Sequence, residues 1–413
     1  MEGLAIIILL LMLVGFIVGI SSAGENKNKE NFREVRTSGN PLAKLNDALG
    51  PVLGSTGFEK VDWGTVSLAE IKRLVESGAD VNARGRMLKT FPDGRSSIGL
   101  SQTPLDCAAD PEIAEYLIAQ GADVNAEDKG FKLTPLHHSS TPEVAAVLLK
   151  HGADINHRSK EDETPLISVL KTRFYDVAEY LLDRGADINV IEKKTGKTPL
   201  CFFVSLDFTK KLLKMGADPN VVAEGKYTPL HYAALFGYID YADLLIKYGA
   251  DVNTLITGVP PLGYADDVDM VNFLLDKGAD IELLDNNQET PLFHAAYGNV
   301  DAVRALVKRG ANINAVDKYG NTPLHYTGDS MVTTYLLMVG IDPNAQNKYQ
   351  ETPLHIAVAT DDLAEDITRE DAIKKIEALL EYGADVNIKN DDGDTPLDIV
   401  KDPEVKDLLE RHK

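Results

Sequence analysis

The 413-residue sequence has little cysteine and a shortage of positive charge, and each shortage excludes a class of protein. The two cysteines, Cys107 and Cys201, are expected to lie too far apart to pair with each other, so we predict that both are buried packing residues. Lysine and arginine number 42 against 64 acidic residues, which gives a net charge of −22 at pH 7. This charge repels phosphate backbones, so we expect no nucleic-acid partner and a preference for basic protein partners.

Motifs for catalysis and metal binding are also missing. Gly196–Thr198 matches the end of a phosphate loop, but Ile191 stands where the first glycine of that loop is needed. The acidic stretch 390–394 lacks the glutamate that closes a calcium loop. No serine or cysteine nucleophile has a partner fixed by a motif. We therefore predict that the protein is not an enzyme and has neither a cofactor nor a metal site.

One long apolar run, Leu4–Ile20, allows two interpretations. Residues 4–23 are long enough to cross a bilayer as a single anchor, and the basic residues after them would keep the rest of the chain in the cytoplasm. Alternatively, residues 1–23 are a signal peptide cut after Ala23, and the protein is secreted or periplasmic. Glu2 counts against a signal peptide, which usually begins with basic residues. The anchor is the main prediction, with membrane contact through this segment alone.

Residues 24–57 are expected to form a polar tether with a short helix over 41–49, and the remaining chain, 58–413, repeats one pattern. The stretch Tyr227–Asn253 shows this pattern best. Thr228 can cap a first helix, and Gly249 is placed to end a second helix in the left-handed conformation. A helix pair this short cannot bury a core alone, so we expect it to stack on copies of itself.

The copies are marked by two recurring motifs. The Thr-Pro-Leu motif, which in one copy is Pro-Pro-Leu, begins at Thr103, Thr134, Thr164, Thr198, Thr228, Pro260, Thr290, Thr322, Thr352 and Thr395. The Gly-Ala-Asp-Val-Asn motif and its variants begin at Gly78, Gly121, Gly152, Gly185, Gly216, Gly249, Gly278, Gly310, Gly340 and Gly383. Most steps within each series are 30 to 34 residues long, which is the period of a helix-turn-helix repeat.

This pattern resembles the ankyrin repeat family, whose signature Thr-Pro-Leu-His-x-Ala stands at Thr228–Ala233 and Thr352–Ala357. The resemblance covers residues 58–413 and implies an all-α solenoid of about eleven helix-turn-helix units, with β-hairpin tips and a cap at each end. An N-terminal hydrophobic helix would precede it. The family implies a non-catalytic scaffold, expected here as a monomer, that binds a protein partner on the concave face formed by the tips and inner helices.

Several units depart from the common length. Residues 84–102 carry an insertion that we expect to be a solvated, mobile loop, and 360–369 carry another between the two helices of one unit. Among the other units, five are short, with 18 residues from the first motif to the second, and those at Thr164 and Thr228 are long, with 21. In short units a capping residue followed by proline, as at Asp110 and Thr141, is predicted to start the second helix.

Four histidines occupy the fourth place of the Thr-Pro-Leu motif: His137, His231, His325 and His355. The resemblance implies that each forms a hydrogen bond to the neighbouring repeat. Histidines spread one to a repeat cannot meet at one metal ion. Gly263 takes this place in the Pro-Pro-Leu unit, so we predict looser bonding there.

A row of apolar residues marks the candidate partner surface, at the position two residues after the asparagine of the second motif. Five consecutive units carry an aliphatic residue there: Ile191, Val222, Leu255, Leu284 and Val316. Aromatic residues stand nearby, at Phe131, Tyr227, Tyr319 and Tyr349. Because such tips are normally polar, we predict that this stripe binds a protein partner that is basic or carries an apolar patch. Two alternatives remain: the stripe extends the core, or the chain is a secreted effector or inhibitor that occludes a target enzyme.

Overall fold

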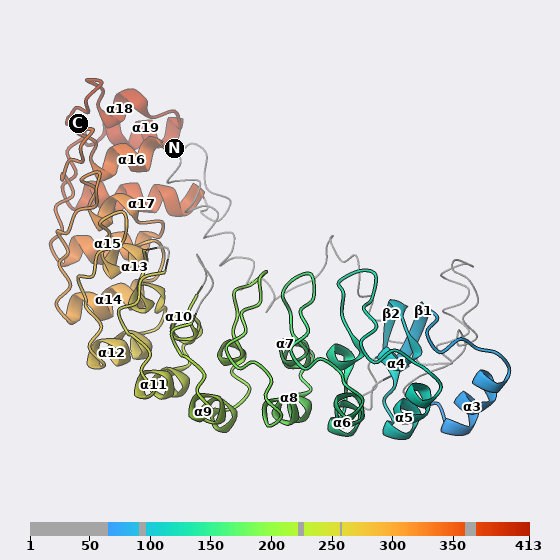
Figure 1. Ribbon diagram of the computed structural model, residues 1–413. Coiled ribbons are helices and arrows are strands. Elements are labelled where there is room, and N and C mark those ends of the chain that lie inside the picture. The colour runs from blue at the N-terminus through green and yellow to red at the C-terminus, as the bar shows by residue number, and fades with distance from the viewer. Residues whose placement is uncertain (1–64, 91–95, 222–226, 257, 360–368) are drawn as a thin grey trace. The chain divides into compact units, whose positions relative to one another are not determined.

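The computed structural model describes residues 65–90, 96–221, 227–256, 258–359 and 369–413, with the backbone alone over 86–101 (Figure 1). The apolar segment 1–23, the tether 24–57, Val222 and most of the second insertion lie outside these residues. Among the helices of the described ranges, none combines the length and the apolar character needed to cross a bilayer. The chain divides into two units, called here the N-terminal block (65–221) and the C-terminal block (227–413).

Both blocks consist of repeats in which a short first helix is followed by a second helix and a loop. The N-terminal block contains α3 (Leu68–Glu76), β1 (Gly85–Thr90), β2 (Ser96–Gln102), α4 (Pro104–Cys107), α5 (Pro111–Ala119), η1 (Pro135–His138), α6 (Pro142–Lys150), α7 (Pro165–Lys171), α8 (Tyr175–Leu182), η2 (Pro199–Phe202) and α9 (Leu206–Lys214). The C-terminal block contains α10 (Pro229–Leu235), α11 (Ile239–Lys247), η3 (Pro261–Tyr264), α12 (Val268–Asp276), α13 (Pro291–Ala296), α14 (Val300–Lys308), η4 (Pro323–Tyr326), α15 (Ser330–Met338), α16 (Pro353–Ala359), α17 (Arg369–Glu381), α18 (Pro396–Ile399) and α19 (Pro403–Glu410). The described residues thus hold α3 and ten helix pairs, where η denotes a 3-10 helix.

The two motifs bound the helices as the sequence predicts. The hydroxyl of Thr228 accepts a hydrogen bond from the backbone N–H of His231 at 3.3 Å, and Pro229 begins α10. Gly249 follows α11 with a φ of +97°, where a residue with a Cβ would be strained. The same arrangement recurs in the other repeats, because the same residues recur at the same places.

The length of each repeat decides the form of its first helix. Long repeats begin with six- or seven-residue α-helices, such as α7 and α10, whereas short repeats begin with four-residue turns such as η1 and η4. In the short repeat of α4, Asp110 accepts hydrogen bonds from the N–H groups of Glu112 and Ile113, at 2.7 and 3.3 Å. This cap starts α5 only a few residues after α4 ends, so no room remains for a longer first helix.

The helices of each block form two layers. First helices contact first helices, as α13 does with η3 and η4, and second helices contact second helices, as α14 does with α12 and α15 (Figure 1). The leucine of the Thr-Pro-Leu motif lies in the first layer and is fully buried in most repeats, including Leu230 and Leu324. Leu397, in the last repeat, is only half-buried. The core is therefore continuous through each block and thins at the C-terminal end.

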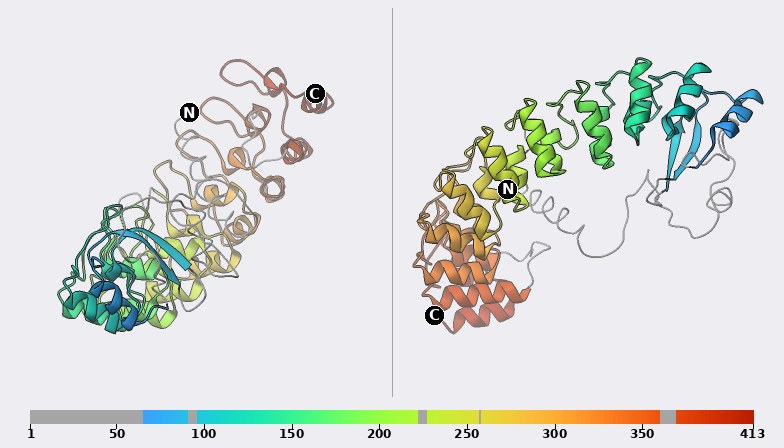
Figure 2. Two further views of the ribbon diagram at one scale, coloured as in Figure 1. Left: turned by 90° about the vertical axis from the view of Figure 1, so that its right-hand side faces the viewer. Right: turned by 90° about the horizontal axis from the view of Figure 1, so that it is seen from below.

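The insertion at 84–102, which we predicted as a solvated, mobile loop, contains a β-hairpin. β1 and β2 pair antiparallel, with Met87 opposite Gly99 and Thr90 opposite Ser96, and Figure 2 shows them as adjacent arrows. The prediction failed because it overlooked Pro92-Asp93-Gly94, a turn sequence between two stretches of strand-compatible residues. The fold is thus an α-helical solenoid with one added β-hairpin, rather than entirely α-helical.

The repeat tips also differ from the expected β-hairpins. In the described residues, strands occur only in the 84–102 insertion, and an isolated bridge joins Ile256 and Val259. Most other tips are tight turns closed by a backbone hydrogen bond, such as that from Asp317 N–H to the carbonyl of Asn321 at 2.9 Å. The reason is that a capping side chain at the start of each turn takes up the N–H groups that a second strand would otherwise bond.

Candidate functional site

Consecutive tips are fastened to one another by main-chain hydrogen bonds. In the C-terminal block the N–H of Lys318 donates to the carbonyl of Asn287, and the N–H of Lys348 donates to the carbonyl of Tyr319, both at 2.8 Å. In the N-terminal block the N–H of Lys160 donates to the carbonyl of Phe131 at the same distance. Backbone bonds of this kind hold neighbouring tips in fixed register, which preorganises the surface that they carry.

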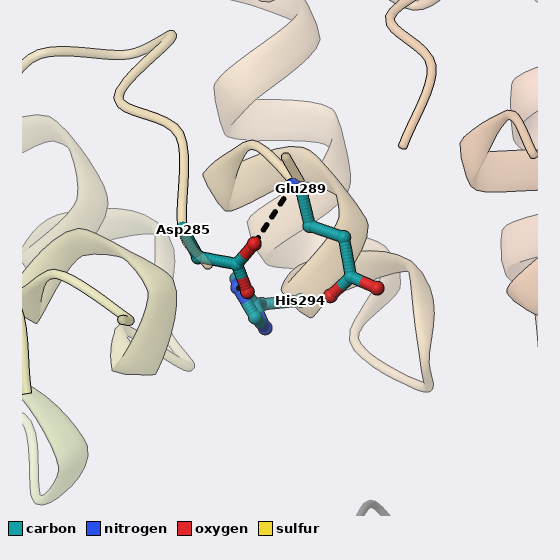
Figure 3. Close-up of side chains that lie close together, drawn as sticks. All are labelled: Asp285, Glu289 and His294. Carbon is teal, nitrogen blue, oxygen red and sulfur yellow. Dashed lines mark hydrogen bonds and ion pairs between the residues drawn. The ribbon is translucent and has the colours of Figure 1, made fainter. Parts of the chain in front are cut away.

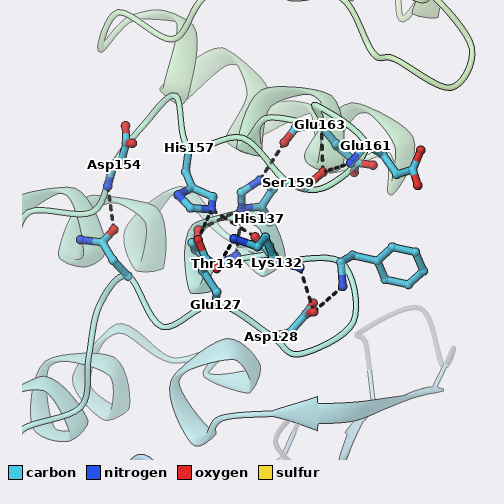
Figure 4. Close-up of polar contacts among 12 residues, drawn as sticks. Glu127, Asp128, Lys132, Thr134, His137, Asp154, His157, Ser159, Glu161 and Glu163 are labelled. Atoms are coloured by element: carbon cyan, nitrogen blue, oxygen red, sulfur yellow. Dashed lines mark hydrogen bonds and ion pairs between the residues drawn. The ribbon is translucent and has the colours of Figure 1, made fainter.

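The histidines of the Thr-Pro-Leu motif bridge neighbouring repeats, as the family resemblance implies. In Figure 4, Nδ1 of His137 lies 2.9 Å from the hydroxyl of Thr134, and Nε2 lies 3.1 Å from the carbonyl oxygen of Glu163 in the next repeat. His231, His325 and His355 make the same pair of contacts, each reaching a carbonyl at 3.2 Å. These four histidines are structural.

Burial keeps these histidines neutral. It lowers the pKa of His137 to about 3 and those of His231 and His325 to about 4, although the hydrogen bond to the next repeat acts in the opposite direction. Burial also lowers the pKa of His355. A neutral imidazole can accept at one nitrogen and donate at the other, which the bridge requires.

The two cysteines are buried and form no disulfide with each other. Cys107 lies with its thiol 3.3 Å from the amide oxygen of Gln102. Burial raises the pKa of Cys201, which disfavours the reactive thiolate.

The predicted apolar stripe is exposed in the C-terminal block. Leu255, Leu284 and Val316 are 41%, 49% and 53% exposed. Tyr319 and Tyr349 are exposed as well. Three successive repeats therefore carry an aliphatic tip side chain at the surface, rather than as part of the core.

Other members of the predicted stripe are not exposed to the same extent or lie outside the described residues. Ile191 is half-buried, and Val222 lies outside the described residues. Tyr227 is also half-buried, because its ring packs edge-on against Tyr232 and Tyr264, with centroids 5.3 and 5.1 Å away. Tyr227 is thus a packing residue, whereas Phe131 in the N-terminal block is 44% exposed.

A second candidate site was not predicted from the sequence. Asp285 and Glu289 belong to one tip and His294 to α13, and their carboxylate and imidazole ligand atoms all lie within 4.8 Å of one another (Figure 3). Asp285 accepts hydrogen bonds from the N–H groups of Asn287 and Glu289, at 2.7 and 2.8 Å. Nε2 of His294 lies 3.4 Å from Oδ2 of Asp285 but makes no hydrogen bond.

Burial makes this cluster electrostatically strained. Glu289 is 4% exposed, and burial raises its pKa to about 7, with Asp285 and Asp317 raising it further against the opposing effect of His294. Burial opposes the charged form of Asp285 too, but the imidazole and the backbone donors outweigh it and lower the pKa of that carboxyl. Burial and the nearby carboxylates, with Glu289 foremost, hold the pKa of Tyr297 well above its usual range.

The sequence carried a signal for this cluster at Gly263. A Cβ on Gly263 would lie 2.7 Å from Cγ1 of Val259 and 3.1 Å from Cδ2 of His294. The glycine that replaces a bridging histidine therefore makes room for the imidazole of the following repeat. Only the structure shows this relation, because His294 stands one place after the motif position that we compared across repeats.

Sequence comparison agrees with the fold. The family described as "Ankyrin repeats (3 copies)" matches residues 105–192, 190–255 and 263–330, and the family "Ankyrin repeat" matches residues 349–391. Together these matches cover more than half of the chain. The chain belongs to the ankyrin repeat family.

Relatives of this ankyrin repeat protein occur in viruses and animals. It is 34% identical over 137 residues to the ankyrin repeat protein FPV230 of fowlpox virus, an alignment that spans 32% of this chain and 73% of the relative. It is 30% identical over 86 residues to the ankyrin repeat protein L371 of Acanthamoeba polyphaga mimivirus, spanning 20% of this chain and 11% of the relative. It is 34% identical over 82 residues to the human 2-5A-dependent ribonuclease, spanning 19% of this chain and 11% of that enzyme.

Proposed function

We propose that this protein is a non-catalytic scaffold that binds a protein partner on the tips of its repeats. Ankyrin repeats generally mediate protein–protein interaction, and this supports the general function. The observation that carries the more specific proposal is the exposed row Leu255, Leu284 and Val316, with Tyr319 and Tyr349 beside it. We call these five residues the tip row.

The tip row has the properties of a binding surface. Its side chains are 40 to 55% exposed and stand on tips that are joined by backbone hydrogen bonds in part of the row. Aliphatic and aromatic side chains on a rigid support contribute apolar contact at a small entropic cost. The net charge of −22 would speed the approach of a basic partner.

The test is affinity capture with the full chain as bait, followed by measurement of Kd for each captured protein. We expect the triple variant Leu255→Asp, Leu284→Asp, Val316→Asp to lose partners that the native protein retains. The matched control is Met331→Asp, Met338→Asp, since these residues of α15 are 59% and 65% exposed but lie outside the tips. Equal capture by the triple variant and the native protein would exclude the tip row as the binding surface.

For the cellular location, we propose a single membrane anchor at residues 4–23, with secretion after cleavage following Ala23 as the alternative. N-terminal sequencing of the mature protein distinguishes the two. A chain that begins at Gly24 would support secretion, and with it the function of an effector or inhibitor.

A further inference from the structure

Asp285, Glu289 and His294 form a set of ligands for a metal ion. They offer two carboxylate oxygens and one imidazole nitrogen, all within 4.8 Å of one another. This mixed donor set matches the ligands that Zn²⁺ takes in proteins. The cluster lies between a tip turn and α13, so two connected elements of one repeat hold all three side chains.

Two polar atoms at the cluster are buried without a hydrogen bond. Glu289 is 4% exposed, and a carboxylate oxygen of it lies within 4.8 Å of the ligand atoms of Asp285 and His294. Nε2 of His294 is buried without a hydrogen bond, although it lies 3.4 Å from Oδ2 of Asp285, and the hydroxyl of Tyr297 is also buried without a hydrogen bond. Buried polar groups are bonded in most native proteins, so unbonded groups at one place need an explanation.

The neighbouring repeat shows that the fold does not require buried polar groups without hydrogen bonds at these positions. Asp317, Asn321 and Tyr326 occupy the equivalent places, 32 residues further along the chain. The amide of Asn321 donates to Oδ2 of Asp317 at 3.0 Å, and the hydroxyl of Tyr326 donates to the same oxygen at 2.7 Å. In the repeat of Asp285, Glu289 stands in place of Asn321 and His294 in place of Tyr326. Two hydrogen-bond donors are thereby replaced by two side chains that can bind a metal ion.

The spacing of the ligands also fits. Nε2 of His294 lies 3.4 Å from Oδ2 of Asp285, which is about the edge of a tetrahedron with bonds of about 2.0–2.1 Å around zinc. A carboxylate oxygen of Glu289 lies within 4.8 Å of the other two ligand atoms.

We propose that Asp285, Glu289 and His294 bind one Zn²⁺ ion, with water in the fourth position. The ion would neutralise the carboxylates and fix the tip that carries Leu284. This site is independent of the proposed binding of a partner by the tip row.

The test is calorimetric titration of the chelator-treated full chain with Zn²⁺. We expect the native protein to bind one equivalent that Glu289→Gln and His294→Ala bind at least about tenfold more weakly, because even partners outside the ligand shell commonly change metal affinity by that factor. The matched control is His151→Ala, which removes a histidine 3.0 Å from the carboxylate of Glu115 on the surface of the N-terminal block. This variant should bind zinc like the native protein.

Two results would overturn the proposal. One is the same zinc stoichiometry and affinity in the native protein, Glu289→Gln and His294→Ala. The other is tighter binding of Ca²⁺ or Mg²⁺ than of Zn²⁺, which would indicate an oxygen-only site. If a variant does not fold, X-ray absorption of the zinc-loaded native protein decides: one imidazole with oxygen ligands supports the site, and sulfur or several imidazoles exclude it.

Discussion

Two neighbouring repeats of the C-terminal block use the same three positions in opposite ways. In one, Asp317, Asn321 and Tyr326 form a closed set of hydrogen bonds. In the other, the carboxylate of Asp285 accepts hydrogen bonds from the backbone, and Nε2 of His294 lies 3.4 Å from it without forming a hydrogen bond. Both tips close with the same backbone hydrogen bond, so the difference lies in the side chains and in the first helix, which is α13 in one repeat and the 3-10 helix η4 in the other. The two repeats therefore keep one fold while the same three positions carry different polar groups.

The largest expected effect comes from breaking the closed set. Asp317 accepts hydrogen bonds from the N–H groups of Tyr319 and Asn321, from the Asn321 amide and from the Tyr326 hydroxyl. Asp317→Ala leaves these donors buried, so we expect a loss of about 4 kcal/mol in the free energy of unfolding at pH 7. Asp285→Ala should cost only about 2 kcal/mol, because it also removes repulsion from Glu289. Urea unfolding followed by circular dichroism measures both, and equal losses would contradict the comparison.

The second largest effect is expected at His325 when the pH is lowered. Burial lowers the pKa of His325 to about 4, below its unfolded value, so its contribution is complete above about pH 6.5. As the pH falls from there toward 4, the native protein should lose about 3 kcal/mol at this site. His325→Phe imitates Phe293, which stands at the same place one repeat earlier and is fully buried. We expect the variant to be less stable at pH 7 but to lose less stability on acidification, as urea titrations at pH 7 and pH 4.5 would show.

Glu289 should respond to pH in the opposite direction. Burial raises its folded pKa to about 7, so its contribution to stability is complete below its unfolded value of about 4.5 and is lost as the pH rises through 7. In the presence of a chelator, Glu289→Gln should therefore be more stable than the native protein by about 2 kcal/mol at pH 8. The gain should disappear near pH 5, and a constant difference between these pH values would argue against the buried charge.

Gly263 tests the contact between the two repeats that flank the cluster. Gly263→Ala would place a methyl group against Val259 and His294. We expect a loss of about 1–2 kcal/mol from this overpacking. Gly298→Ala is the control, because its Cβ would meet nothing within 4 Å. Equal melting temperatures for both variants would contradict the prediction that a methyl group at position 263 crowds Val259 and His294.

The smallest effect is expected at the tip row. Leu255, Leu284 and Val316 are at least 41% exposed, so each substitution by Asp should change the free energy of unfolding by less than about 0.5 kcal/mol. Thermal unfolding of the triple variant checks this. A large loss would mean that the side chains belong to the core, and the binding test would then be uninformative.

The repeats could be predicted from the sequence because their determinants are local. Thr228 caps a helix, Gly249 ends a helix, and Leu230 is buried. Each of these three outcomes follows from residues within a few positions in the chain. The bridging histidines were predicted through the family resemblance. The β-hairpin at 84–102 was missed although Pro92-Asp93-Gly94 is a local turn signal, so that error lay in the interpretation.

The site could be predicted only in part. The exposure of Leu284 followed from its place in the repeat, but the half-buried position of Tyr227 depends on Tyr264 of the next repeat. The cluster of Asp285, Glu289 and His294 could not be predicted from motif spacing, because its imidazole occupies space that Gly263 leaves open one repeat earlier.

The sequence by itself determined the succession of helices, the register of the repeats and the family, because a helix cap, a helix end and an apolar stripe are set by residues close together in the chain. Only the tertiary structure decided which side chains are exposed on the tips and which polar groups meet without bonding. Those outcomes depend on the space that each repeat leaves for the next, and residues about 30 positions apart determine it.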